Sequence, residues 1–164
     1  MTINGTTQKL TGLYHSPLGD IVLTSDGSAL TELRFAEATN REPAQDIPSL
    51  ADACRWLDLY FSGCMPNFTP RLAPLGTPFQ LSVWRELLTI PYGQTTSYGF
   101  VAKRLLCHSA QAVGGAVGRN PIALIIPCHR VIGSDGHLTG YAYGLDRKQW
   151  LLSHETKITG TPCQ

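Results

Sequence analysis

A cysteine, a histidine and an arginine interrupt an apolar run in the second half of the chain. The stretch LIIPCHRVIGSDG places Cys128, His129 and Arg130 between the aliphatic residues of 124–126 and 131–132. A thiol attacks as its thiolate, and a free cysteine, with a pKa of about 8.5, is only a few per cent ionised at neutral pH. A neighbouring imidazole can take up the proton. The stretch therefore predicts nucleophilic chemistry at Cys128, with His129 as the base.

The imidazole needs an acceptor of its own, which fixes its tautomer and stabilises its positive charge. Glu155, Asp135 and Asp146 are the candidate acceptors, and composition alone does not choose among them. Neighbours on an extended strand point to opposite faces, so contact between Cys128 and His129 needs a bend or a bridging water.

A second Cys-His pair, Cys107-His108, provides a comparison within the chain, because it has no apolar frame. For an isolated pair of this kind, a buried structural cysteine beside a satisfied histidine is the commoner interpretation. Neither pair has the spacing of a structural zinc site, so we expect no metal. The five cysteines, an odd number, are expected to be reduced thiols in a cytoplasmic protein.

The elements that position this chemistry form two groups. SPLGDIVLTSDGSALTELRF is typical of a hairpin that turns at Asp26-Gly27, and a helix capped by Ser49 is expected to run to Gly63. The prolines of residues 64–78 then predict a linker. We expect an α+β protein with a small N-terminal α/β domain, residues 1–70, and a mostly helical C-terminal domain, residues 76–164.

Capping patterns predict the helices of the second domain. Thr77 and Gln80 fit a capping box with Pro78 between them, and Ser97 and Ser109 fit the N-caps of two further helices. Two short helices joined by a tight turn indicate a helix-turn-helix. We expect the C-terminal domain to contain a winged helix-turn-helix-like DNA-binding unit. The segment ALII, residues 123–126, is expected to be a buried strand, and Asp146 is expected to cap a last helix that reaches Glu155.

Charge and hydropathy limit the function further. Residues 1–75 carry a net charge of −3 and residues 76–164 a net charge of +4, so the second half is the one expected to meet a polyanion. No stretch approaches the roughly 20 apolar residues of a membrane-spanning helix, and MTINGTTQKLTG lacks the apolar centre of a signal peptide. Both observations predict a cytoplasmic location and no membrane partner.

The segment IPCHRVIG resembles the active-site signature of the O-6-alkylguanine-DNA alkyltransferases, the methylated-DNA–protein-cysteine methyltransferases. GTPFQLSVWRELLTIPYGQTTSY, AVGGAVGRNPIALIIPCHRVIG, GYAYGL and LLSHE follow in the family's order. The resemblance is strong over residues 76–156, and the hairpin YHSPLGDIVLTSDGSALTEL is similar to the family's variable N-terminal domain.

The resemblance implies direct-reversal DNA repair. Cys128 would accept the alkyl group from guanine O-6 as a thioether, activated by His129 through a water. Glu155 would orient His129, and Tyr98 would donate a proton toward the departing guanine. Each molecule would act once, on double-stranded DNA that contains O-6-alkylguanine, as a monomer and without a cofactor. Some members carry a zinc in the N-terminal domain, but no matching cysteine-histidine set occurs here.

The resemblance also implies two sets of binding residues. Asn120 would support the turn that carries the site, and Tyr141 would flank the pocket for the flipped base. The pocket residues implied in this way are Val131, Tyr141, Ala142, Tyr143 and Asn120. The DNA-binding residues implied are Thr95, Ser97, Ala110, Gln111, Ala112, Gly114 and Arg119.

The sequence departs from the family pattern in three places. Gln111 stands where the family usually has an arginine that fills the gap left by the flipped base. The turn LLCHS replaces a Gly-x-Pro element, and Tyr143, where many members have glycine, is expected to narrow the pocket. The competing hypotheses are a lesion sensor or regulator that binds DNA without transfer, which Gln111 keeps open, and a cysteine hydrolase using Cys128.

Overall fold

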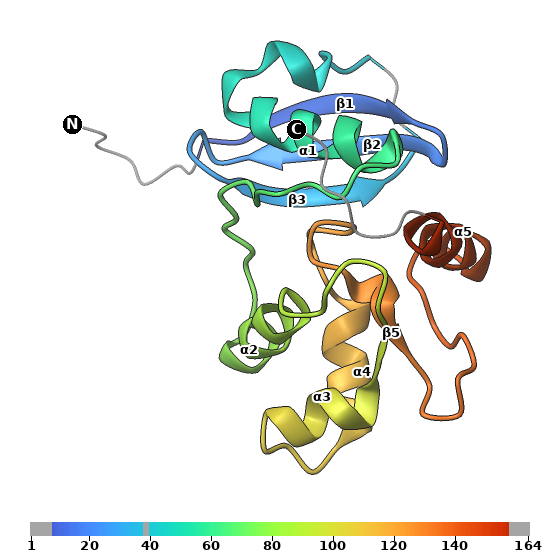
Figure 1. Cartoon of the computed structure of the whole chain (residues 1–164). Coiled ribbons are helices and arrows are strands. Elements are labelled where there is room, and N and C mark those ends of the chain that lie inside the picture. The colour runs from blue at the N-terminus through green and yellow to red at the C-terminus, as the bar shows by residue number, and fades with distance from the viewer. Residues whose placement is uncertain (1–7, 38–39, 158–164) are drawn as a thin grey trace.

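The computed structural model describes residues 8–37 and 40–157, and it has a sheet domain followed by a mostly helical domain (Figure 1). A three-stranded antiparallel sheet and one long helix form the first part, and a winged helix-turn-helix-like arrangement forms the second, as predicted. The strands are β1 (Leu10–Ser16), β2 (Gly19–Ser25), β3 (Leu30–Phe35), β4 (Thr96–Ser97) and β5 (Val131–Ile132). The α-helices are α1 (Ala51–Phe61), α2 (Pro78–Leu87), α3 (Tyr98–Arg104), α4 (Ala110–Gly118) and α5 (Leu145–Thr156).

The predicted hairpin is the β2–β3 pair, and its turn has the expected chemistry. Oδ1 of Asp26 accepts the backbone N–H groups of Ser28 and Ala29, both at 2.8 Å, while Gly27 takes a φ of +99° that suits glycine. The structure adds β1 before it, so that the strand order is β1-β2-β3 with β2 in the centre. The sheet packs one face against α1 (Figure 1).

Both edge strands of this sheet pair with irregular segments of the chain. At the β1 edge, the N–H of Leu13 donates to the carbonyl of Glu42 at 2.8 Å. At the β3 edge, the N–H of Leu33 donates to Pro121 at 2.9 Å, and Leu33 accepts from Ala123 at 3.0 Å. The segment that leads into the Cys128 turn is therefore attached to the N-terminal sheet.

The predicted caps of the C-terminal helices are confirmed. Thr77 and Gln80 form a complete capping box at α2, and the Ser97 hydroxyl accepts the N–H of Phe100 at the start of α3. The Ser109 hydroxyl caps α4 by accepting the N–H of Ala112 at 3.0 Å. Because these caps are local interactions, the sequence pattern was sufficient to find them.

Two predicted caps are wrong. Ser49 does not cap α1, because Pro48 starts a 3₁₀ turn, Pro48–Leu50, that continues directly into the helix. Asp146 does not cap α5 either: the helix begins one residue earlier, after Gly144, whose φ of +97° turns the chain. Asp146 lies in the first turn of α5, where a carboxylate still favours the helix dipole.

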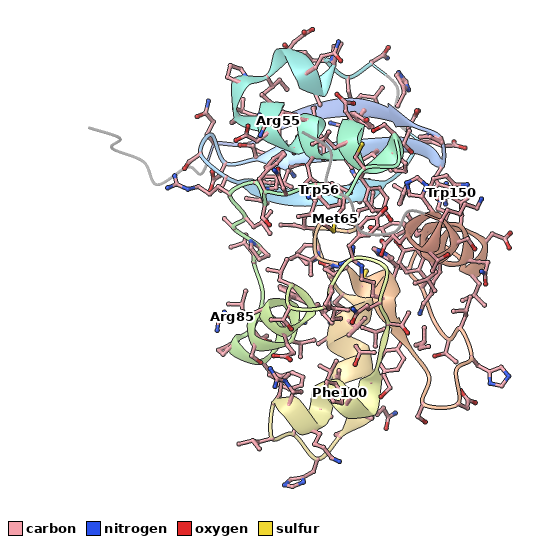
Figure 2. The ribbon with its side chains drawn as sticks, in the orientation of Figure 1. Arg55, Trp56, Met65, Arg85, Phe100 and Trp150 are labelled. Atoms are coloured by element: carbon pink, nitrogen blue, oxygen red, sulfur yellow. The ribbon has the colours of Figure 1, made fainter. Side chains whose placement is uncertain are left out.

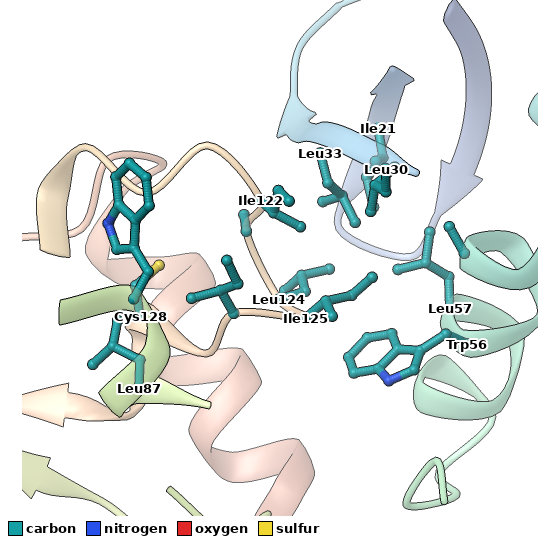
Figure 3. Packing of buried hydrophobic residues seen from close by; sticks show 14 of the residues in the cluster. Ile21, Leu30, Leu33, Trp56, Leu57, Leu87, Ile122, Leu124, Ile125 and Cys128 are labelled. Carbon is teal, nitrogen blue, oxygen red and sulfur yellow. The ribbon is translucent and has the colours of Figure 1, made fainter. Parts of the chain in front are cut away.

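The expected ALII strand is also wrong. Only Ile122 forms an isolated bridge, to Leu33, and residues 123–125 form a turn in which the N–H of Ile126 donates to the carbonyl of Ile122 at 3.1 Å. Leu124 reaches this turn with a φ of +69°, unfavourable for a branched side chain. Figure 3 shows that the apolar side chains of the turn fill the space between the sheet and the segment carrying Cys128.

The expectation that all cysteines are reduced is wrong at Cys64. Cys54, Cys107 and Cys128 are free thiols, whereas Cys64, in the proline-rich segment after α1, is disulfide-bonded. Cys128 keeps its thiol. Nothing in the part of the chain that is described has both the length and the apolar character of a membrane-spanning helix.

Candidate active site

Cys128 lies on a 3₁₀ turn, Cys128–Arg130, and not on an extended strand. The turn supplies the bend that a Cys128–His129 relay requires. Asn120 holds the preceding loop at both ends: its Nδ2 donates to the carbonyl of Ile126 at 2.8 Å, and its Oδ1 accepts the N–H of Ile122 at 3.0 Å. These two hydrogen bonds place Asn120 where the resemblance expects support for the turn.

Glu155, on α5, is the acceptor that the structure brings to His129. Nε2 of His129 lies 2.5 Å from Oε2 of Glu155, and neither side chain is more than 1% exposed. Asp135 instead pairs with the exposed His137 at 2.9 Å, and Asp146 is exposed on α5. The geometry thus selects one of the three carboxylates that the sequence left open.

The Glu155 carboxylate has donors on both oxygens. Oε1 accepts from Nε of Arg130 at 2.7 Å and from the N–H of Gly93 at 3.1 Å. Oε2 accepts from the Tyr60 hydroxyl at 2.7 Å in addition to His129. Sequence reasoning missed Tyr60 and the Arg130 contact, because the first comes from the other domain and the second depends on the turn.

The buried groups of the relay have shifted pKa values. Burial alone would raise the pKa of Glu155, but hydrogen bonds and charge from His129 and Arg130 outweigh it and hold that pKa far below its usual range. Burial lowers the pKa of His129 and is not offset by Glu155, because Arg130 and Lys148 also oppose a positive imidazole. The resting relay therefore consists of an ionised carboxylate and a neutral imidazole.

One ring nitrogen of the neutral imidazole carries no proton and can accept one. Since Glu155 is ionised, it accepts a hydrogen bond from the Nε2–H group of His129, and the lone pair lies on Nδ1. Nδ1 is buried and has no hydrogen-bond partner among the described residues. Burial also raises the pKa of Cys128, although a hydrogen bond from Asn120 and the charge of Lys148 act against this. The thiol is thus neutral at rest, next to an unused base.

Lys148 is a second residue that the sequence did not reveal. Its side chain is fully buried, and Nζ donates to the carbonyl oxygens of Val131 at 2.7 Å, Thr139 at 3.1 Å and Gly140 at 3.3 Å. Burial lowers its pKa, while interaction with a Cys128 thiolate raises it. Within LDRKQW the lysine looks like part of a solvated helix face, so only the tertiary structure shows this role.

A cavity of ≈470 Å³ lies between Cys128 and α4. It has the size and mainly apolar character of a small-molecule site. The Tyr98 hydroxyl donates to the carbonyl of Thr139 at 3.0 Å beside it. The side chains and backbone that line the cavity belong to Tyr98, Ala110, Gln111, Gly114, Val117, Gly118, Cys128, Thr139, Gly140 and Tyr141.

Four expected pocket residues lie outside this lining. Asn120 and Val131 are buried, and Ala142 is exposed. The ring of Tyr143 packs edge-on against Phe35 of the N-terminal sheet, with centroids 5.3 Å apart. Tyr143 does not line the cavity. The structure therefore does not show the narrowing of the pocket that was expected at this residue.

The expected DNA-binding residues lie in two places on the helix-turn-helix. Ala110, Gln111 and Ala112 are exposed in the first turn of α4, and Arg119 is exposed at its end. Thr95 and Ser97 lie before α3 and line a separate cavity of ≈480 Å³. Ala110, Gln111 and Gly114 therefore line the Cys128 cavity, whereas Thr95 and Ser97 line the other one.

The glycines of α4 are not explained by packing within the protein. A Cβ placed on Gly115 or Gly118 would meet no atom within 4 Å, and one on Gly114 would lie 3.7 Å from the Tyr98 ring, an ordinary contact. Glycine costs about 1 kcal/mol relative to alanine inside a helix. These positions thus leave open space along the helix for another molecule.

A buried thiol with a His-Glu relay, next to a helix-turn-helix and a base-sized cavity, defines a DNA-binding protein with a cysteine nucleophile. The chain belongs to the 6-O-methylguanine DNA methyltransferase family. Residues 9–74 match the family's ribonuclease-like domain, and residues 78–157 match its DNA binding domain.

Named relatives and solved structures agree with this assignment. A methylated-DNA–protein-cysteine methyltransferase of Methanosarcina acetivorans is 45% identical over 149 residues, which cover 87% of this chain and 96% of the relative. One of Mycobacterium tuberculosis is 47% identical over 146 residues, covering 85% and 88%. The crystal structure of Mycobacterium tuberculosis OGT in complex with DNA is similar, with a TM-score of 0.81 and 45% identity over 90% of this chain and 92% of that one.

Proposed function

We propose that this protein repairs O-6-alkylguanine in double-stranded DNA by moving the alkyl group to Sγ of its own Cys128. The observation that carries the proposal is the buried His129–Glu155 contact, 2.5 Å long, which leaves Nδ1 of His129 as the free base beside Cys128. A chain that served only to bind DNA would have no use for a buried base next to a buried thiol.

The lesion must leave the helix to reach this thiol. A base stacked in a duplex is inaccessible to a side chain that is 7% exposed, so the nucleotide has to be flipped into the cavity of ≈470 Å³. The open positions at Gly115 and Gly118 support close approach of the α4 backbone to the minor groove. Gln111, exposed and lining the cavity, would face the gap left in the stack.

The transfer then needs two proton movements. Nδ1 of His129 takes the thiol proton through a bridging water, and Glu155 stabilises the resulting imidazolium. Sγ forms a bond to the alkyl carbon as the bond from that carbon to guanine O-6 breaks. The guanine receives a proton from the Tyr98 hydroxyl, which is neutral at rest and whose pKa burial raises further. The thioether that remains is not hydrolysed, so each molecule reacts once.

The remaining residues have supporting roles in the proposal. Asn120 holds the turn, and Lys148 favours the forming thiolate through its charge. Tyr141, whose hydroxyl is buried without a partner in the described structure, would flank the flipped base. We take the protein to act as a monomer, with one lesion per molecule.

Intact-mass measurement after incubation with an O-6-methylguanine duplex tests the proposal. We expect a gain of one methyl group, mapped to Cys128 by peptide analysis. An unchanged mass with retained DNA binding would contradict transfer and support a lesion sensor, and continuous turnover of a small ester or amide would support a hydrolase.

A further inference from the structure

A tyrosine of the N-terminal domain reaches the proton relay of the C-terminal domain. Tyr60, in the last turn of α1, is fully buried, and its hydroxyl donates to Oε2 of Glu155 at 2.7 Å. The same oxygen faces Nε2 of His129 at 2.5 Å. Two donors from different domains thus share one carboxylate oxygen.

The Tyr60 ring is held from several sides. Trp56 stacks on it within α1, with centroids 5.1 Å apart and an interplanar angle of 9°. Nε2 of His154, one residue before Glu155 on α5, lies 2.6 Å from the Tyr60 carbonyl. Trp150 stacks on His154 with centroids 4.7 Å apart and lies on the side of α5 toward the N-terminal domain (Figure 2). The hydroxyl position is therefore fixed by packing between the domains.

The hydrogen bond that Tyr60 donates to Oε2 reduces the negative charge that this oxygen presents to His129. A carboxylate that accepts such a hydrogen bond carries less negative charge on its oxygen. It therefore stabilises a neighbouring imidazolium less. We propose that Tyr60 is a positioning residue: it acts through Glu155 on His129, so that the N-terminal domain completes the relay. This inference rests on the proposed function, because it concerns the same transfer reaction.

Other charged and titratable groups surround the relay, and they stay in place when the Tyr60 hydroxyl is removed. Those that face it from the neighbouring elements are Arg130, Tyr92, Lys148, Cys128, Tyr141 and His154. Assigned titration of the His129 ring by nuclear magnetic resonance separates its protonation from that of His154.

The variant Tyr60→Phe removes the hydroxyl and keeps the ring. Without this donor, Oε2 carries more negative charge, the imidazolium of His129 is better stabilised, and the base becomes protonated at higher pH. We expect the acid limb of the transfer-rate profile, and the His129 titration, to move up by about half a pH unit or more. A role in packing alone would lower stability and leave both profiles in place.

A stronger donor at the same position should act in the opposite direction. Site-specific replacement of Tyr60 by 3-fluorotyrosine keeps the ring and makes the hydroxyl a better donor. The acid limb should then move to lower pH. This substitution also keeps the proposal testable if Tyr60→Phe does not fold.

Tyr92→Phe is the matched control. The Tyr92 ring packs edge-on against Tyr60 with centroids 6.0 Å apart, but its buried hydroxyl has no hydrogen-bond partner among the described residues. Its profile should coincide with that of the wild type. An unmoved profile in both Tyr60 variants, or an equal shift in Tyr92→Phe, would overturn the inference. A wild-type protein that takes up no methyl group would instead refute the proposed function.

Discussion

Nε2 of His129 and Oε2 of Glu155 lie 2.5 Å apart with both side chains buried, so the imidazole has a fixed tautomer before any DNA arrives. Burial protects this arrangement, because neither side chain is more than 1% exposed to solvent. The fixed tautomer leaves Nδ1 as the ring nitrogen without a proton, and the first prediction tests the carboxylate that creates this tautomer.

Glu155→Gln should lower the transfer rate by at least about tenfold, because general acid–base contributions are commonly about 100-fold or more. It should also destabilise the fold by about 3–5 kcal/mol, the usual cost of leaving a buried partner such as Arg130 without its counter-charge. Quenched single-turnover transfer and urea unfolding measure the two effects. Asp135→Asn, which removes an exposed carboxylate, should change neither, and a full wild-type rate in Glu155→Gln would exclude Glu155 from the relay.

The pH dependence follows from the lowered pKa values of His129 and Glu155. Because the base stays neutral below its ordinary value of 6.5, the acid limb of the transfer rate should lie below pH 6.5. The free energy of unfolding should also decrease as the pH falls. The unfolded chain binds a proton at His129 below pH 6.5, and at Glu155 below its ordinary value of 4.5, before the folded state does. A rate midpoint above 6.5, or stability that rises on acidification, would contradict these shifts.

Cys128→Ser should abolish transfer while leaving duplex binding within about twofold of the wild type, because a serine hydroxyl is a far weaker nucleophile than a thiolate. Intact mass and a binding titration give the two readouts. Cys107→Ser, in the exposed turn before α4, is the control and should transfer normally. Methyl uptake that persists in Cys128→Ser and maps to Cys107 would mean that the acceptor is the other thiol.

Two glycine variants, Gly115→Ala and Gly118→Ala, separate an effect on helix stability from an effect on DNA binding. Since neither added methyl meets an atom of the protein within 4 Å, each should stabilise the helix by up to about 1 kcal/mol. If DNA packs against α4, the same methyl groups should weaken duplex affinity. Thermal unfolding and a binding isotherm at fixed salt test both. Unchanged affinity in both variants would place the DNA elsewhere.

Gln111→Arg should speed transfer from duplex DNA and leave transfer from the free alkylated base nearly unchanged. An arginine would fill the vacated stack and add a phosphate contact, which steepens the salt dependence of binding by roughly 0.9 in log–log slope. The free base needs no flipping and is the internal control. Equal changes with both substrates would mean that residue 111 does not replace the flipped base.

Local sequence patterns predicted the helices around the site, whereas the contacts between residues far apart in the chain became visible only in the structure. The Thr77, Ser97 and Ser109 caps depend on neighbours within three residues, so their spacing was enough. Tyr60 reaches Glu155 across 95 positions of the chain, and no local pattern carries that information. Nothing in the sequence singled out Lys148, because a lysine between polar neighbours on a helix is usually solvated.

The misassigned ALII segment has a physical explanation of the same kind. Four aliphatic residues fit a buried strand and a buried turn equally well. Asn120 decides the outcome, because its side chain provides the hydrogen bonds that a strand partner would otherwise provide. The left-handed backbone at Leu124 is accepted because the surrounding core, including Ile122 and Ile125, fixes the turn.

The pairing of both sheet edges has a consequence for the behaviour of the protein in concentrated solution. An open edge strand is a template for strands of other molecules and promotes aggregation. Here Leu13 at one edge and Leu33 at the other bond to segments of the same chain. Loosening the attachment of residues 121–123 would expose the β3 edge and release the Cys128 turn together. Loss of repair competence and the onset of self-association should therefore begin with the same local unfolding event.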